Sequence, residues 1–304
     1  MSASDVTPVA SVAVVARPMS RLSAYAILVK PDVTFLVVLT TMAGFYLGTK
    51  GPIQAIGMFH AVFGTTLVAG GTAALNQYFE RLTDAKMRRT SARPLPLGAL
   101  QPLEVLAFGA GLIVLGGGYL ALFTNWLACA LALLTSALYL GVYTPLKTRT
   151  TLATAIGAIP GAIPPLIGWA AARGSLGGGA WLLFAILFLW QFPHFHSIAW
   201  MYRDDYARAG IRMLPVVDHT GSATFGQIIF TAAALVPISL LPSVIGLAGH
   251  TYFFGALVLG MLLVEACLWV SRSRTNARAK WLMHATVVHI PLLLGLLMLD
   301  KVVR

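Results

Sequence analysis

The chain has 304 residues, of which 58% are hydrophobic and only 10% are charged. Soluble domains carry about 25% charged residues, so this composition excludes an ordinary soluble protein and indicates a chain that crosses a membrane several times. The net charge of +11 would suit a nucleic-acid-binding protein. However, the basic residues stand between apolar stretches, as they do in cytoplasmic loops of membrane proteins, so we expect a lipid bilayer as partner and no nucleic acid.

The first 22 residues contain a short apolar patch from Val9 to Ala16. No basic residue precedes this patch, so the segment lacks the charged start of a secretory signal peptide. It also lacks the Arg-rich character of a transit peptide. We expect residues 1–22 to form a disordered tail and residues 23–304 to form a single membrane domain.

Nine later stretches are long and apolar enough to cross a bilayer, which takes about 20 residues. They are 31–49, 53–75, 103–123, 126–144, 152–172, 180–200, 225–247, 251–270 and 283–300. With the N-terminus in the cytoplasm, the cytoplasmic segments carry 17 of the Lys and Arg residues and the opposite side carries 4. This asymmetry predicts an all-α bundle in the cell (inner) membrane, with the long loops 76–102 and 201–224 in the cytoplasm.

The first long loop begins with NQYFERLTDAKMRRT, in which Asn76, Glu80 and Asp84 are spaced by four. On a helix this spacing drifts by only about 40° per step, so the three side chains share one face. Mg²⁺ prefers such oxygen ligands and typically binds through one or two carboxylates plus substrate phosphates. A basic group suited to phosphate oxygens follows: Lys86, Arg88, Arg89 and Arg93. The pattern favours a metal–diphosphate site over the alternative, a solvated helix end.

The second long loop, MYRDDYARAGIRMLP, contains Asp204 and Asp205, and both are catalytic candidates. Adjacent helical residues point about 100° apart, so one of the two is expected to face the site, and the spacing does not decide which. We take Asp204 as the third metal ligand beside Glu80 and Asp84. Tyr202 and Tyr206 either hydrogen-bond the substrate or sit at the headgroup level as interfacial aromatics.

The motif N-x3-E-x3-D-x2-M-x-R-T-x2-R-P, from Asn76 to Pro94, resembles the first motif of the intramembrane prenyltransferases. The variant of this motif with a glutamate in the middle, here Glu80, resembles that of the protohaem IX farnesyltransferase (haem O synthase) branch. The likeness covers roughly residues 22–300 and includes KPDVTFLVVLTTMAGFYLG, VYTPLKTRT, AIGAIPGAIPPLIGWAA and YRDDYARAGIRMLPVV. The second loop departs from the wider superfamily because it lacks the D-x3-D spacing, and Arg212 stands where Pro is expected.

The resemblance implies a nine-helix bundle around a central cavity, with farnesyl diphosphate and haem B as substrates and Mg²⁺ as the metal. It implies transfer of the farnesyl group to a haem vinyl group, with haem O and diphosphate as products. Asn76, Glu80 and Asp84 would bind metal or diphosphate, accompanied by Arg89 and Arg93. The resemblance leaves open contact with proteins of haem A synthesis or oxidase assembly.

The histidines in the predicted spans are candidates for contact with haem, because an ionisable residue inside a spanning helix is a functional candidate by default. His194 and His196, just before the second acidic loop, rank ahead of His60, His284 and His289. A packed, hydrogen-bonded histidine is the alternative in each case.

Lys147 and Arg149 lie between the fourth and fifth spans. They either bind diphosphate or haem propionates, or serve only as topology anchors. Glu265, an isolated acid in the eighth span, has no role in this hypothesis.

Three other functions compete with this one, and the last, a structural or assembly-factor role for an oxidase complex, is not tested by any feature of the sequence. The first is prenylation of an aromatic ring in quinone biosynthesis, against which Glu80 and the missing D-x3-D both count. The second is a transporter with broken helices, which would place ionisable residues near mid-membrane. Here the charges gather at one rim, which favours chemistry on a diphosphate.

Overall fold

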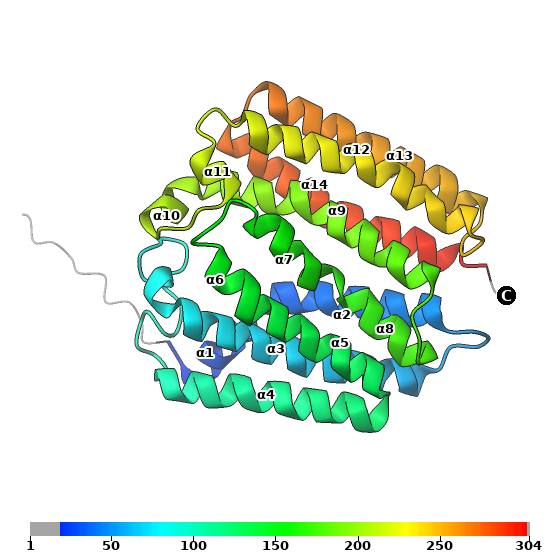
Figure 1. The fold of residues 1–304 in the computed structure, drawn as a ribbon, viewed down its shortest axis with the longest axis horizontal. Coiled ribbons are helices and arrows are strands. Elements are labelled where there is room, and N and C mark those ends of the chain that lie inside the picture. The colour runs from blue at the N-terminus through cyan, green and yellow to red at the C-terminus, as the bar shows by residue number, and fades with distance from the viewer. Residues whose placement is uncertain (1–18, 303–304) are drawn as a thin grey trace, which may run out of the picture.

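In a computed structural model the chain forms a bundle of long helices, and the structure describes residues 19–302 (Figure 1). Within that range nine segments are long and apolar enough to span a membrane. They are α2 (Pro31–Gly48), α3 (Ala55–Asp84), α4 (Pro102–Phe123), α5 (Trp126–Ala137) continuing through η1 (Leu138–Tyr143) and α6 (Thr144–Leu146), α7 (Ala153–Ala162) with α8 (Pro164–Arg173), α9 (Gly178–Met201), α12 (Ser222–Val244), α13 (His250–Arg272) and α14 (Asn276–Leu299). The predicted all-α fold with nine spans is confirmed, and the protein is a multi-pass membrane protein.

Three short helices complete the fold: α1 (Arg21–Leu28), α10 (Arg203–Arg208) and α11 (Leu214–Val217). Ser20 caps α1, since its hydroxyl accepts a hydrogen bond from the Ser23 amide at 3.2 Å. Most of the tail that was predicted to be disordered, residues 1–22, lies outside the described residues, and α1 begins at Arg21.

Two helices extend well beyond their predicted spans. α3 continues to Asp84 instead of ending at residue 75, and α14 begins at Asn276 instead of residue 283. The prediction stopped where charged residues begin, whereas the backbone hydrogen bonds of a helix do not depend on apolar side chains. At α14 the Thr275 hydroxyl caps the start by accepting from the Arg278 amide.

The fifth span is two helices, because Pro164 and Pro165 open α8 directly after α7. Proline suits the first turn of a helix and ends the one before it. The α8 segment then packs backbone to backbone on α2, where the glycines Gly44 and Gly168 permit the close approach.

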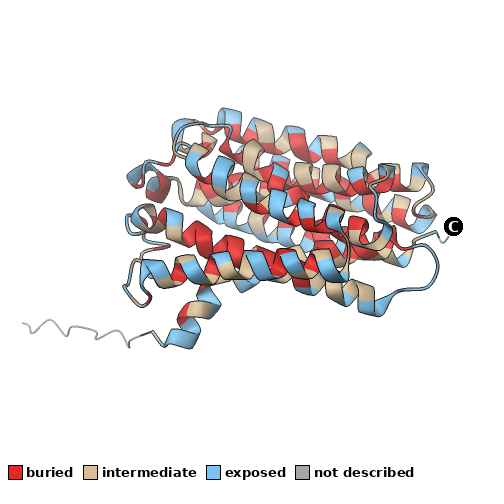
Figure 2. Ribbon diagram, turned by 60° about the horizontal axis from the view of Figure 1, so that its bottom comes forward, coloured by how far each residue is buried: buried red, intermediate tan, exposed pale blue. Residues whose placement is uncertain are grey.

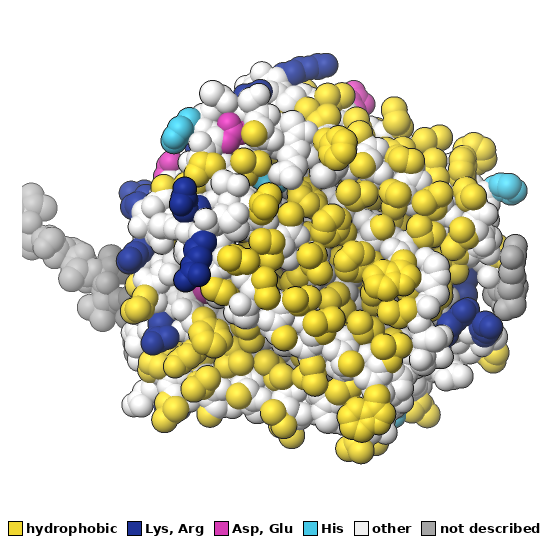
Figure 3. All heavy atoms as spheres, viewed as in Figure 1, with side chains coloured by type: hydrophobic (Ala, Val, Ile, Leu, Met, Phe, Trp, Pro, Cys, Tyr) yellow, Lys and Arg dark blue, Asp and Glu magenta, His cyan; other side chains and the backbone are white. Residues whose placement is uncertain are grey.

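The buried residues line the inner faces of the helices, while the outer faces expose apolar side chains (Figures 2 and 3). The largest core cluster surrounds α9, which packs on α12 and α14 and buries Trp190, Leu183 and Ile186. The long loop after α3 and the segment from α10 to α11 lie at the same end of the bundle (Figure 1). The charged chemistry predicted for both loops is therefore gathered at one end.

Candidate active site

The extension of α3 places the first-loop acids inside the protein. Asn76, Glu80 and Asp84 are only 2%, 6% and 0% exposed. The Nδ2 group of Asn76 donates a hydrogen bond to Oε1 of Glu80 at 2.7 Å, as the four-residue spacing on one helical face allows. The three side chains thus form one buried polar row at the end of α3.

Three cations from three other segments meet this row. Lys30 Nζ donates to Oδ1 of Asn76 at 2.8 Å, Lys147 forms an ion pair with Glu80, and Arg93 Nη1 lies 2.7 Å from Oδ2 of Asp84. We call Asn76, Glu80, Asp84, Lys30, Lys147 and Arg93 the polar cluster. Burying two carboxylates is costly unless they are paired, and here each has a cationic partner.

Among the described residues, a buried carboxylate oxygen of Asp84 has no hydrogen-bond partner. Oδ1 of Asp84 is buried and has no hydrogen-bond partner among residues 19–302, while Oδ2 is held by Arg93. The loop around this carboxyl is fixed, because the Thr90 hydroxyl donates to the Asp84 carbonyl oxygen at 2.9 Å. A buried acceptor without a partner calls for an additional ligand, such as a cation.

A π-helical turn brings a further segment to the polar cluster. η1 interrupts the fourth span, and Thr144 directly after it accepts a hydrogen bond from Asn76 Nδ2 at 3.3 Å and donates to the Tyr139 carbonyl oxygen at 2.8 Å. Tyr139 and Tyr143 of this turn have ring centroids 5.0 Å apart. Such π-turns inside α-helices occur frequently at functional sites.

The second long loop contacts the first through Asp205. Its Oδ2 accepts a hydrogen bond from the Arg89 amide at 3.2 Å, and its other oxygen pairs with Arg208. Asp205 is buried, whereas Asp204 is exposed. The structure therefore places Asp205, and not Asp204, against the first loop. Within the described range no three His, Cys, Asp or Glu side chains lie close enough together to hold a metal ion, and a metal contact of Asp204 stays a prediction.

Backbone and apolar contacts lock the two loops together. The Arg212 amide donates to the Lys147 carbonyl oxygen at 2.9 Å, which ties the second loop to the segment that pairs with Glu80. Beneath the loops, Met87 of the first packs in one buried cluster with Tyr206 and Ile211 of the second. Burial raises the pKa of the Tyr206 hydroxyl, so this group stays protonated.

Several predicted site residues lie apart from the polar cluster. Lys86 and Arg149 are exposed, and the Tyr202 ring lies under the Arg89 guanidinium at 5.2 Å. His194 stacks on Trp190 and bonds Thr286 at 2.9 Å, and the fully buried His196 bonds Gln227 at 2.8 Å. Both histidines are thus hydrogen-bonded within the helix packing, and their contact with haem stays a prediction.

Sequence reasoning missed Lys30 as a site residue. This residue caps α2 with a left-handed backbone (φ 47°), a sparsely populated conformation for a lysine and one that is typical of functional sites. Burial, followed by the positive charge of Arg93, lowers the pKa of Lys30 to about 8. The available signal was a single base, directly before a proline, at the loop end of a membrane span.

Comparisons with known proteins agree with this architecture. The sequence profile of the UbiA prenyltransferase family matches residues 37–289. The Protoheme IX farnesyltransferase of Koribacter versatilis (strain Ellin345) is 48% identical over 294 residues, which are 93% of this chain and 95% of the relative. The protein of the same name from Solibacter usitatus (strain Ellin6076) is 46% identical over 286 residues, which are 91% and 98% of the two chains.

Two solved structures share the fold. A structure concerned with digeranylgeranylglyceryl phosphate synthase in membranes has a TM-score of 0.76 at 18% identity, covering 92% of this chain and 98% of that one. A UbiA homolog from Archaeoglobus fulgidus, bound to DMAPP and Mg²⁺, has a TM-score of 0.63 at 14% identity, covering 90% and 99%. With the profile matching most of the sequence and relatives this similar over nearly their whole length, the chain belongs to the UbiA prenyltransferase family.

Proposed function

We propose that the protein transfers the farnesyl group of farnesyl diphosphate to a vinyl group of haem B, giving haem O and diphosphate. The main support for this proposal is the polar cluster, in which two buried carboxylates of α3 lie beside cations from three other segments. The similarity to proteins named Protoheme IX farnesyltransferase supports haem as the acceptor.

In this proposal the diphosphate binds at the polar cluster. Lys30, Lys147 and Arg93 supply positive charge in a setting with little water, where charge-assisted hydrogen bonds to phosphate oxygens are strong. Binding the anion rearranges pairs that the cations now make with Asn76, Glu80 and Asp84. Arg89 is exposed, and its amide donates a hydrogen bond to Asp205, so its guanidinium is free to bind a phosphate oxygen in this proposal.

The residues also fit a magnesium ion. The free Oδ1 of Asp84 and the carboxylate of Glu80 are the two oxygen donors that Mg²⁺ commonly takes from a protein, the rest coming from phosphate and water. The Mg²⁺ in the Archaeoglobus fulgidus homolog supports the same metal here. When bound, the ion supplies neutralisation of negative charge on the departing diphosphate. We propose Asp205 as the second-loop residue that supports this site, through Arg89.

The transfer then follows from charge and exclusion of water. The carbon–oxygen bond of farnesyl diphosphate breaks, and its electron pair leaves on the diphosphate, which Lys30, Lys147 and Arg93 stabilise. The terminal vinyl carbon of haem forms the new carbon–carbon bond with the allylic cation. Water adds a hydroxyl group to the other vinyl carbon and loses a proton. The aromatic faces of Tyr139 and Tyr143 favour a cation and exclude water near Thr144.

We further propose that the loop end of the bundle faces the cytoplasm in the inner membrane, because the basic residues concentrate there. Contact with proteins of haem A synthesis or oxidase assembly stays a prediction.

The test is direct turnover. Purified protein is given haem B, farnesyl diphosphate and Mg²⁺, and the extracted pigment is analysed by mass spectrometry. We expect haem O from the native chain and none from Asp84→Asn, which should stay folded because Asn keeps the size of the buried side chain. Native protein that farnesylates a quinone ring and leaves haem unchanged would overturn the assignment.

A further inference from the structure

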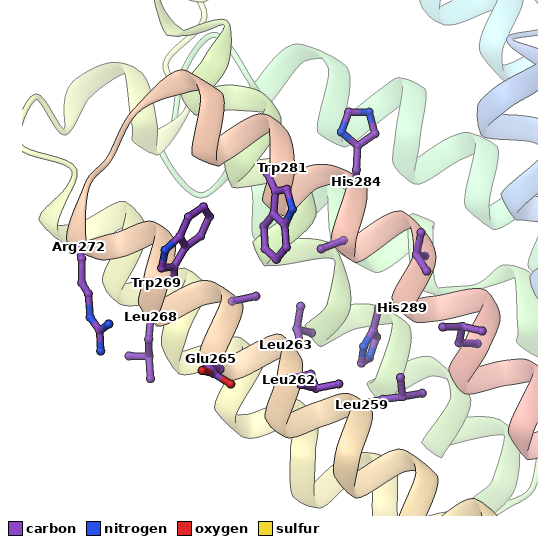
Figure 4. Close-up of a pocket in the computed structure, with 14 residues that line it drawn as sticks. Leu259, Leu262, Leu263, Glu265, Leu268, Trp269, Arg272, Trp281, His284 and His289 are labelled. Atoms are coloured by element: carbon purple, nitrogen blue, oxygen red, sulfur yellow. The ribbon is translucent and has the colours of Figure 1, made fainter.

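A groove lies between α13 and α14, and it shares no residue with the polar cluster (Figure 4). Its volume is about 800 Å³, within the range of roughly 300–1,000 Å³ that small-molecule and cofactor sites occupy. The walls are apolar and include Leu259, Leu263 and Leu292. Leu262 and Val288 of the same groove are more than half exposed, so it opens on the outer, bilayer-facing surface of the bundle.

One buried polar atom borders this apolar groove. His289 is 6% exposed, and its Nε2 has no hydrogen-bond partner in the described part of the chain. Figure 4 shows its ring between α14 and α13. Buried imidazole nitrogens are normally hydrogen-bonded, so a free one beside a groove indicates a missing ligand. A neutral imidazole nitrogen is a common ligand of iron and other transition metals.

The end of the groove nearest the long loops is aromatic and cationic. Trp269 and Trp281 meet edge to face with centroids 5.3 Å apart, and the Arg278 guanidinium lies 4.3 Å from the Trp269 ring centroid. Arg272, the last residue of α13, lines the groove at this end. Its guanidinium suits a carboxylate, since it offers paired donors in a planar fork.

We propose that this groove binds haem from the bilayer, with Nε2 of His289 facing the iron and Arg272 binding a propionate. The identity of the ligand rests on the proposed function. A haem combines the three properties that the groove recognises: a broad apolar ring, a metal that accepts an imidazole, and acidic groups at one edge. Glu265 lies two helical turns before Arg272, and its like charge disfavours propionates in the middle of the groove.

Other ligands would account for fewer features of this groove. Lipid acyl chains would fill the apolar walls but leave Nε2 of His289 without a partner. A helix of another membrane protein would need a polar side chain opposite His289. Because the groove is separate from the polar cluster, we assign it as a loading site, where haem leaves the lipid before it reaches the diphosphate end of the bundle.

The test is haem titration of the full-length chain in lipid nanodiscs, followed by the Soret band and by resonance Raman for the iron–histidine bond. His289→Ala should weaken haem binding by roughly tenfold or more and remove the histidine ligand, a tenfold change being about 1.4 kcal/mol. Binding of metal-free protoporphyrin should not change. His250→Ala, at the opposite end of α13, is the matched control and should bind haem like the native chain.

Two variants keep the test valid if His289→Ala fails to fold. Leu262→Trp fills the exposed side of the groove and should block haem, whereas Leu115→Trp on the exposed face of α4 should not. Arg272→Gln should weaken binding of haem several-fold but leave binding of its dimethyl ester unchanged, because the ester has no carboxylate.

The outcomes separate this inference from the proposed function. Asp84→Asn should lose transfer yet keep the His289-dependent spectrum. Haem O production with a spectrum that His289→Ala does not alter would overturn the groove assignment alone. A folded chain that binds no haem overturns it too. A His289-dependent spectrum without any farnesylation would leave the groove standing and remove the proposed reaction.

Discussion

Lys30 and Asn76, which are 46 positions apart in the sequence, are joined by a hydrogen bond of 2.8 Å between Nζ and Oδ1 at the loop end of the bundle. The bond links the start of α2 to the polar row of α3, and it depends on a left-handed backbone at a residue that precedes a proline. A non-glycine residue in this conformation costs about 1–3 kcal/mol, so the rest of the structure must hold Lys30 there. We infer that this residue is positioned for the diphosphate.

Diphosphate binding should therefore depend on pH through Lys30. Its pKa is lowered to about 8, so the ammonium form is complete well below pH 8 and is lost as the pH rises above it. An anion favours the charged form, so binding at pH 8 should take up protons and should weaken between pH 7 and 9. Calorimetry in buffers of different ionisation enthalpy measures this uptake.

Lys30→Met should weaken diphosphate binding by roughly tenfold or more at pH 7, since a hydrogen bond to a charged group contributes about 1.5–3 kcal/mol. It should also remove the proton uptake. Lys50→Met, at an exposed position at the other end of α2, is the control. Proton uptake that persists in Lys30→Met would assign the titration to another group.

Lys147→Met should destabilise the protein, because it leaves the buried Glu80 carboxylate without its ion-pair partner. Breaking a buried ion pair costs about 3–5 kcal/mol of stability. We expect a loss at the low end of this range, because the nearby positive charge of Lys30 still partly compensates the Glu80 carboxylate. Adding Glu80→Gln to Lys147→Met should restore part of the loss. Thermal unfolding midpoints in detergent measure both steps. Equal losses in the single and double variants would contradict the pairing.

Asp205 and Asp204 form a matched pair of neighbours, one buried and one exposed. Asp205→Asn should slow farnesyl transfer by roughly tenfold to a hundredfold, because the Arg89 amide loses its charged acceptor and the first loop shifts. Asp204→Asn should transfer at the native rate. Single-turnover kinetics with saturating farnesyl diphosphate distinguish the two. A larger effect at Asp204 would reverse the assignment.

Gly168→Ala should loosen the contact between α8 and α2, since the new methyl group would collide with the Thr41 carbonyl oxygen. Overpacking of this kind costs about 1–3 kcal/mol, so the thermal midpoint should fall. Gly118→Ala on α4, where nothing lies within 4 Å of the added carbon, should leave the midpoint unchanged or raise it. Similar midpoints for the two variants would show that α2 and α8 separate at little cost.

Several features of the fold and of the candidate site could be predicted from the sequence alone. The apolar lengths predicted all nine spans, and the loop charges predicted which end carries the acids and bases, because both depend only on how each segment partitions between water and lipid. The four-residue spacing predicted the shared face of Asn76, Glu80 and Asp84, because helical geometry is local.

Contacts between distant segments were decided only by the tertiary structure. The partners Lys30 and Lys147, the choice of Asp205 over Asp204, and the packing of His194 and His196 away from the polar cluster all depend on how separate helices lie against one another. A one-residue difference on a helix turns a side chain by about 100°, so the sequence pattern could not say which neighbour faces inward. That rotation is fixed by packing across the whole bundle.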